Sequence, residues 1–530
     1  MNNNITNGDV NRIAVVRQIA DNILHYGRDC YAKSRGDLAN SPMFADGLNI
    51  NTKEHIKWKP PEGKAFAVSN LVNQQNLFRT LSALSNLTGN DQYKNAAVEA
   101  IKFHFDKFQD KSGLLQWGGH RVINLEKLQV NGNKSMKHEL KNAFPYYELM
   151  YQVNPEKTVK FIKAFWNAHV FDWANLEISR HGSYGKEICL LWEHDFNNPD
   201  PFRETIGLSF LSAGNDLIYS AAMLYKLTGD KKALKWAKRL AKMYVKARNP
   251  RTNLGTYKYT KAMKRGETND YSNTNSKYGD RAFRQLGPEF GKAALEGNML
   301  SGGEPYSIYV MNALMELQLT DDIGEEVKEF AEWTLDGLNA YIDYAYMPEK
   351  NMFKPLITDG TDLSGYVLPR DGYYGKAGKV MKPFLTDSTY FYSFSRAFEF
   401  SDDLRYWEIL RNIAIYYDLG DLGKSPGKKT KINFKTKCQQ EILIFGLICI
   451  YRATAINDYL QLASIIADNI IENNYNKGFF VSTGSNIALF DTVKPLAILS
   501  LEAELRDEAD KVANYIVGIG SKQSRKHYIK

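Results

Sequence analysis

LYKLTGDKKALKWAKRLAKMYV, residues 224–245, predicts a pair of antiparallel helices. The first helix is expected to end at Leu-Thr-Gly, a typical stop signal, and Asp230 then stands where an N-cap residue begins the next helix. Apolar residues follow at helical spacing, at Ala233, Leu234, Ala237, Leu240, Ala241 and Tyr244. The stretch therefore predicts a helical hairpin with one buried face.

The same plan recurs along the chain. Residues 75–106 repeat it around a turn at 87–91, and similar junctions occur at 400–403 and 455–458. The hairpins differ in length, which argues against a solenoid with a fixed period. We expect a mainly α protein, an (α/α) toroid or barrel of about seven hairpins, with residues 1–530 in a single domain.

Long segments rich in Gly, Asn and Asp separate the hairpins, at 111–135, 178–207, 249–305 and 350–388. Loops of this length are usually functional. We expect them to carry short strands and to gather at one mouth of the barrel, around a cleft. A loop-rich or strand-rich insertion is expected near 250–300.

The composition limits the classes of partner. The net charge of +8, spread over 530 residues, indicates a mild preference for anionic partners and no nucleic-acid surface. The basic run 424–437 is typical of a solvated loop. No apolar run approaches the ~20 residues of a membrane span. We therefore expect no nucleic acid and no membrane as partner, and a monomer.

The four cysteines show no Cys-x-x-Cys pattern, which favours a reducing compartment; they are Cys30, Cys189, Cys438 and Cys449. The first residues, MNNNITNGDVNRIAVVRQ, contain no apolar signal segment. These features predict a cytoplasmic protein, or a periplasmic one if the sequence is a truncated mature form.

Two histidines and a carboxylate form a candidate metal site. They are His120 in Trp-Gly-Gly-His-Arg, Glu139 in Lys-His-Glu-Leu, and His181 in Ser-Arg-His-Gly. Two imidazoles and one carboxylate make a recurring metal-ligand set. Glycine beside both histidines lets the backbone approach a ligand closely. Arg180, next to His181, suggests an anionic substrate.

These stretches resemble family 2 of the polysaccharide lyases, the pectate lyases built on an α/α barrel. The matching segments are WGGHR (117–121), KHELKNAFPYYELMY (137–151), AFWNAHVFDW (164–173), SRHGSYGK (179–186), GLSFLSAGNDLIYSAAMLYKLTG (207–229) and SKYGDRAFRQLGPEFG (276–291). The resemblance implies that His120, Glu139 and His181 hold a transition metal and that Arg180 is the base. It also implies cleavage of α-1,4-linked polygalacturonate or its oligomers by β-elimination, giving 4,5-unsaturated products.

Imidazole ligands favour one divalent transition metal over calcium, with manganese expected first and cobalt or nickel as alternatives. Arginine is a difficult base, because its pKa lies above 12. Arg180 could instead stay charged and clamp a carboxylate, which would leave Lys186 or Tyr184 as base. Five residues are expected to bind substrate: Lys186, Tyr184, Lys277, Arg281 and Arg284.

Other histidines are expected to be structural. Adjacent helical side chains diverge by about 100°, so His138 should not share a metal with Glu139. His169 lies in an aromatic run, and His194 is also expected to pack.

Two other functions stay open. One is a glycoside hydrolase with two carboxylates taken from Asp172, Glu177, Asp195 and Asp280. The other is a binding protein for oligouronides without activity. Within the lyase interpretation, the missing leader favours exolytic release of disaccharides from imported oligomers, with a loop in 249–305 closing the cleft; endolytic cleavage is the alternative.

Overall fold

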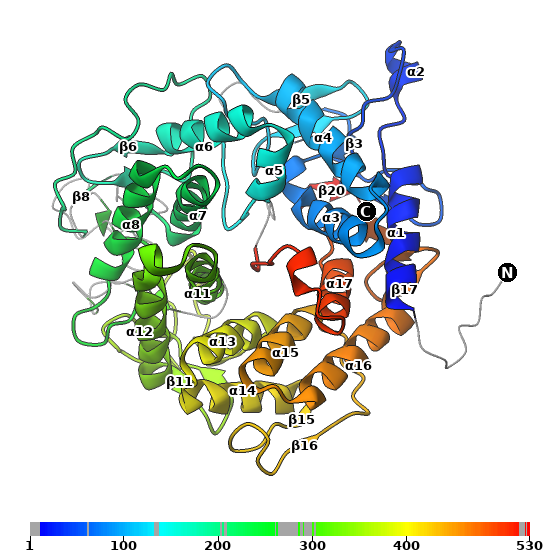
Figure 1. Ribbon diagram of the computed structural model, residues 1–530. Helices are drawn as coiled ribbons and strands as arrows, with labels where there is room; N and C mark the ends of the chain where they lie inside the picture. Colours follow the sequence, from blue (N-terminus) through cyan, green and yellow to red (C-terminus); the bar gives the residue numbers. More distant parts are fainter. Residues whose placement is uncertain are drawn as a thin grey trace.

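The computed structural model describes residues 11–60, 63–131, 137–201, 204–205, 209–259, 261–262, 285–286, 290, 299–300, 304–518, 525 and 527–529. Within these residues the helices pair in sequence as inner and outer members of a ring (Figure 1). The pairs are α3 (Gln75–Thr88) with α4 (Gln92–Phe108), α5 (Tyr147–Val153) with α6 (Pro155–His169), α7 (Leu211–Thr228) with α8 (Lys231–Lys246), α11 (Glu304–Ile323) with α12 (Lys328–Tyr344), α13 (Ser388–Ser401) with α14 (Leu404–Tyr416), and α15 (Glu441–Thr454) with α16 (Asn457–Asn474).

The two ends of the chain close this ring. Helix α17 (Lys494–Glu504) packs against α15 and α3 on the inside, and α1 (Arg12–Tyr26) packs against α17 from the outside. The Arg12 guanidinium lies 2.8 Å from the carboxylate of Asp468 in α16 and 2.9 Å from that of Glu502 in α17. This seventh pair confirms the predicted (α/α) toroid.

Inner-to-outer turns lie at one end of the ring, so the outer-to-inner connections lie at the other. Those connections carry the short strands predicted for the long loops. They are β4 (Val122–Asn124) and β5 (Gln129–Asn131), β6 (Val170–Asp172) and β7 (Glu177–Ile178), β11 (Tyr346–Met347), β12 (Met352–Phe353) and β14 (Phe384–Leu385), β15 (Gly420–Asp421) and β16 (Lys431–Ile432), and β17 (Tyr475–Asn476) and β18 (Phe479–Phe480). We call this end the strand mouth.

The hairpin turns have the predicted geometry. The residue after the inner helix takes a left-handed conformation at Gly89 (φ 70°), Gly229 (φ 76°), Asp402 (φ 54°) and Ala455 (φ 55°). Asp230 caps α8 by accepting hydrogen bonds from the backbone N–H of Lys232 and of Ala233. Local sequence therefore determines where each of these hairpins turns.

Two of these four turn positions carry a side chain in the left-handed conformation, Asp402 and Ala455, and aspartate tolerates this conformation better than alanine. Exchanging Ala455 for glycine should raise the free energy of unfolding by about 0.5–1 kcal/mol, because a Cβ atom is strained in the left-handed region. Urea denaturation measures this. The matched control Ala453→Gly, inside α15, should lower the free energy of unfolding by a similar amount. A loss of stability in Ala455→Gly would contradict the expectation.

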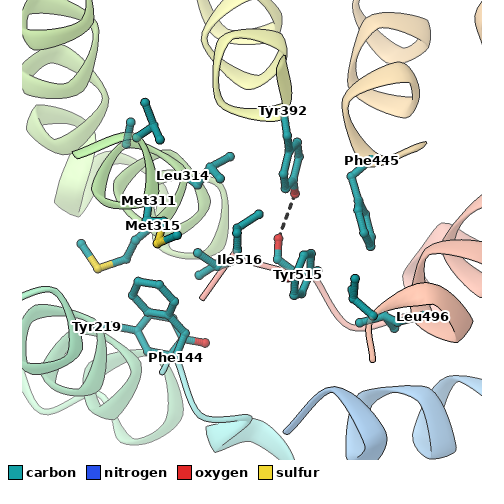
Figure 2. Packing of buried hydrophobic residues seen from close by; sticks show 14 of the residues in the cluster. Phe144, Tyr219, Met311, Leu314, Met315, Tyr392, Phe445, Leu496, Tyr515 and Ile516 are labelled. Carbon is teal, nitrogen blue, oxygen red and sulfur yellow. Dashed lines mark hydrogen bonds between the residues drawn. The ribbon is translucent and has the colours of Figure 1, made fainter. Parts of the chain in front are cut away.

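The segment after α17 fills the axis of the ring. Its residues Val512, Tyr515, Ile516 and Val517 are buried, and the Tyr392 hydroxyl donates to the Tyr515 carbonyl oxygen at 2.8 Å. Figure 2 shows Tyr515 and Ile516 among side chains of the inner helices. We call residues 512–518 the axial segment.

Beyond the axial segment, β20 (Tyr528–Ile529) joins a sheet near the strand mouth. The strand order is β20, β2 (Lys57–Trp58), β3 (Phe66–Ser69), β4 and β5. Since α17 ends at the turn end of the ring, the chain crosses from one end to the other between α17 and β20. The axial segment therefore lies in the middle of the toroid, among side chains of the inner helices (Figure 2).

Three other expectations concern the insertion near 250–300, membrane-spanning helices and the cysteines. The predicted insertion near 250–300, and with it Lys277, Asp280, Arg281 and Arg284, lies largely or wholly outside the described residues. In the part of the chain that the structure describes, no helix meets the length and hydropathy needed to cross a membrane. All four cysteines are free thiols.

Candidate active site

The three candidate metal ligands meet at the strand mouth. His120 and Glu139 lie in the connection from α4 to α5, and His181 lies in the connection from α6 to α7. Backbone hydrogen bonds join these loops: Gly119 N–H donates to the Glu139 carbonyl oxygen at 3.1 Å, and His138 and Gly182 exchange two bonds of 2.9 Å. The segment around Glu139 is thus the middle of three adjacent strand-like loops.

The ligand atoms converge closely. His120 Nε2 lies 3.0 Å from Glu139 Oε2, and His181 Nε2 lies 3.5 Å from Glu139 Oε1. The two imidazole Nε2 atoms are 3.3 Å apart. All three ligand atoms lie within 4.8 Å of one another. Residues separated by long stretches of sequence are thus presented to one point.

These distances fit a single ion. Two ligand atoms bound at about 2.1 Å, at an angle of about 90–110°, lie about 3.0–3.4 Å apart. The imidazole nitrogens are 3.3 Å apart, and they lie 3.0 Å and 3.5 Å from the two different oxygens of the Glu139 carboxylate, close to this range. Two imidazoles and one carboxylate suit a transition metal better than calcium. His120, Glu139 and His181 could therefore hold such a metal.

Glu139 is held as a buried anion. Its side chain is 2% exposed, with Lys141 Nζ at 3.3 Å and Arg180 Nε at 3.4 Å from Oε1. Burial alone would raise its pKa, but hydrogen bonds from His120 and His181 and the charge of Lys141 outweigh burial and hold the pKa of this carboxyl well below its ordinary value. The carboxylate is therefore deprotonated and available as a ligand.

Glycines make room for the ligands. A Cβ atom on Gly119 would lie 2.2 Å from Glu139 Oε2, and one on Gly118, which has φ +107°, would lie 2.3 Å from the Glu139 carbonyl oxygen. A Cβ atom on Gly182 would lie 2.4 Å from His169 Nε2. The glycines beside the two histidines are thus required by close approach, as the sequence pattern indicated.

Gly119→Ala tests this close approach. The added methyl group should displace the Glu139 carboxylate and weaken manganese binding about 10- to 100-fold, the usual cost of a disturbed ligand environment. Calorimetric titration of the metal-free protein measures the affinity. Gly446→Ala is the matched control, because its Cβ would meet Phe391 at 2.5 Å in the core. The control should lower the melting temperature and leave manganese affinity unchanged; equal affinity in both variants would contradict the prediction.

Two buried histidines, His138 and His169, connect the ligand loops by hydrogen bonds on the core side of the cluster. Trp117 Nε1 donates to His138 Nε2 at 3.0 Å, which leaves the proton of His138 on Nδ1. That atom donates to His169 Nε2 at 2.8 Å, and His169 Nδ1 donates to the Ser179 carbonyl oxygen at 2.8 Å. Burial lowers the pKa of both imidazoles, to about 4 for His169, so both stay neutral.

These hydrogen bonds agree with the expectation that His138 and His169 are structural. The reason for His138 differs from the one expected, because residues 138–139 form extended bridges and not a helix. In an extended segment, neighbouring side chains point to opposite faces. His138 therefore points into the core while Glu139 points to the mouth. His194 stacks on Trp173, with ring centroids 4.6 Å apart.

A known protein family matches most of the chain. The family described as periplasmic pectate lyase matches residues 41–524. The chain belongs to this family. A pectate disaccharide-lyase of Dickeya dadantii (strain 3937) is 41% identical over 374 residues, 68% of this chain and 68% of that protein.

Solved structures with similar folds include two carbohydrate enzymes. A sugar epimerase from a ruminal bacterium has a TM-score of 0.43 and 15% identity, covering 84% of this chain and 98% of that one. A GH76 α-1,6-mannanase variant of Salegentibacter sp. HEL1_6 has a TM-score of 0.40 and 11% identity, covering 94% of this chain and 99% of that one.

Family membership makes the protein a pectate lyase, hence a polysaccharide lyase, and the two alternative functions lose their support. The family's description as periplasmic gives no support to a cytoplasmic location.

Of the hydrolase candidates, Asp172 accepts hydrogen bonds from the backbone and side-chain amide of Asn175. It lies opposite Glu177 in the β6–β7 hairpin, and Asp195 is exposed.

The lyase places its candidate base beside the ligands. Arg180 is 7% exposed, and its Nε lies 3.3 Å from His181 Nε2. Tyr184 and Lys186 make other contacts: the Tyr184 hydroxyl donates to the Leu115 carbonyl oxygen at 3.1 Å, and Lys186 Nζ donates to the Asn167 carbonyl oxygen at 2.5 Å. Burial raises the pKa of Tyr184 above its usual value. Substrate binding by these two residues stays a prediction.

Two residues of the pectate lyase site were missed by sequence reasoning. Lys141 contacts Glu139, as given above, and Asp216 on α7 accepts hydrogen bonds from Ala143 N–H at 2.8 Å and Phe144 N–H at 3.0 Å. Asp216 thereby holds the turn that follows Glu139, where Phe144 has φ 43°. An acidic residue within the apolar run of α7 was the available signal for Asp216.

Proposed function

We propose that this pectate lyase holds one divalent transition metal, manganese first, at His120, Glu139 and His181, and cleaves galacturonan chains exolytically into unsaturated disaccharides. The observation that carries the proposal is the convergence of the three ligand atoms within 4.8 Å, with a buried arginine in contact with two of them. Calcium is not proposed, because two of the three ligands are imidazoles.

The chemistry follows from what surrounds the cluster. A metal at this site would draw charge from the C6 carboxylate of a galacturonate residue and so make its C5 proton more acidic. Arg180, as the neutral guanidine, would take that proton. The electron pair of the C5–H bond would then form the C4–C5 double bond as the C4–O bond breaks, and the leaving oxygen would take a proton from solvent water.

The exolytic mode is supported by one relative. The relative from Dickeya dadantii is named a disaccharide-lyase. In this chain the axial segment is buried at the centre of the ring, so we expect the polymer to bind at the strand mouth in either mode of cleavage. The loop in 249–305 that was expected to close the cleft lies largely outside the described residues.

One digest tests reaction and mode together. Polygalacturonate is incubated with the manganese-loaded protein, ultraviolet absorbance of the C4–C5 double bond is followed, and early products are separated by size. The proposal expects absorbance together with unsaturated disaccharide as the main early product. A ladder of medium-length oligomers would instead establish endolytic cleavage, and products without the absorbance would exclude a lyase reaction.

Two finer points belong to the same proposal. We propose a monomer acting on galacturonate oligomers, which sedimentation at the enzyme's working concentration would test. Fractionation of the native cells would decide between the periplasm, which the family's description supports, and the cytoplasm.

A further inference from the structure

Cations flank every ligand in the cluster. Arg121 follows His120, Lys137 and Lys141 stand on either side of Glu139, and Arg180 precedes His181. Two of these cations reach the ligand carboxylate: Lys141 Nζ lies 3.3 Å from Glu139 Oε1, and Arg180 Nε lies 3.4 Å from the same oxygen. The ligand set is thus surrounded by more positive charge than one carboxylate requires.

Lys141 is the most accessible of the three side chains Lys141, Glu139 and Arg180. Its side chain is 19% exposed, whereas those of Glu139 and Arg180 are 2% and 9% exposed. Lys137 differs, because its ammonium donates to Ser183 Oγ at 3.1 Å. Lys141 is therefore the lysine that both contacts the ligand carboxylate and faces the open mouth.

The charges are unbalanced once a metal is present. With neutral imidazoles and a protonated Arg180, Lys141 and Arg180 exceed Glu139 by one positive charge, and a bound dication would raise the excess to three. With Arg180 as the neutral guanidine, the excess with the dication would still be two. Partly buried charges of one sign are costly unless anions accompany them. A galacturonate chain carries one carboxylate on each sugar, so the substrate itself can supply those anions.

We infer that Lys141 binds the carboxylate of a galacturonate residue at the cleavage site, turning from Glu139 toward the substrate when the metal occupies the ligands. This assignment rests on the proposed function. The competing explanation is that Lys141 only positions Glu139. The two differ in sign for metal affinity, because a substrate-binding lysine repels the dication whereas a positioning lysine helps to hold its ligand.

The test compares Lys141→Met, Lys141→Arg and the matched control Lys137→Met, which removes the same charge from the same loop. Manganese affinity of the metal-free proteins and trigalacturonate affinity of the manganese-loaded proteins are measured by calorimetry, the latter in an Arg180→Lys background that slows turnover. Lys141→Met should weaken trigalacturonate binding about 10- to 100-fold, the worth of a charged hydrogen bond. It should bind manganese as tightly as the parent protein or more tightly.

Two further variants and one modified ligand complete the test. Lys141→Arg should recover part of the lost trigalacturonate affinity, and Lys137→Met should stay within about threefold of the parent protein, as expected for a screened surface charge. Methyl-esterified trigalacturonate, which lacks the carboxylates, should bind equally to the parent protein and to Lys141→Met.

Three results would overturn the inference: weaker manganese binding in Lys141→Met, equal losses in Lys137→Met and Lys141→Met, or an equal loss with the methyl ester. Failure of the proposed function looks different. In that case the unaltered protein gives no unsaturated product from polygalacturonate, while the dependence of trigalacturonate binding on Lys141 is still measured independently.

Discussion

Replacing Glu139 with alanine is expected to abolish stoichiometric metal binding and to lower kcat/KM on polygalacturonate by about a thousandfold. Glu139 is the one anion among the three proposed ligands, and Lys141 and Arg180 lie 3.3 and 3.4 Å from its Oε1. Without the carboxylate, a dication would face two imidazoles and two cations. His181→Ala should have a similar effect, because it removes a ligand beside Arg180.

Elemental analysis of the purified variants and the ultraviolet rate assay measure this together. His194→Ala is the control, since His194 stacks on Trp173 outside the cluster and should keep both metal and rate. Undiminished metal content and activity in Glu139→Ala and His181→Ala would exclude the site.

Arg180→Lys is expected to lower kcat about 10²- to 10⁴-fold, the usual contribution of a positioned base. Metal content should be unchanged, because none of the three ligands is altered.

The same variant separates the two roles open to this arginine. Arg180 could instead stay charged and clamp a carboxylate. Lysine would then preserve the positive charge, so kcat should fall little, but KM should rise because lysine replaces the planar guanidinium poorly. A fall in kcat at nearly constant KM supports the base. Near-normal turnover in Arg180→Lys would refute it.

The hairpins could be predicted from sequence because their signals are local. The turn at Gly229 and the cap at Asp230 lie next to each other, and the apolar spacing of α8 follows at once. The pairing of α1 with α17 had no such signal. Arg12 and Glu502 are 490 positions apart, and neither helix has a partner next to it in sequence that reveals the contact.

The candidate site was likewise predictable only in part. Glycines beside His120 and His181 marked the ligand loops, since close backbone approach leaves a trace in sequence. The bond between His138 and His169 joins residues 31 positions apart. It depends on the register of irregular loops, which side-chain pattern does not encode. Lys141 was overlooked because a lysine two positions beyond a ligand is equally common on a solvated surface.

The closure of the ring by α1 and α17 has a consequence for how the protein is made. During synthesis at about 5–20 residues per second, the 490 positions between Arg12 and Glu502 take about 25–100 s to appear. Throughout that time the face of α1 that carries Val16, Ile19 and Ile23, buried in the finished protein, has no α17 to cover it. The other hairpins meet their partners within seconds of leaving the ribosome. A nascent chain stalled before residue 494 should therefore remain an open arc that chaperones for apolar segments can bind at its first helix, and release from them should follow the emergence of α17.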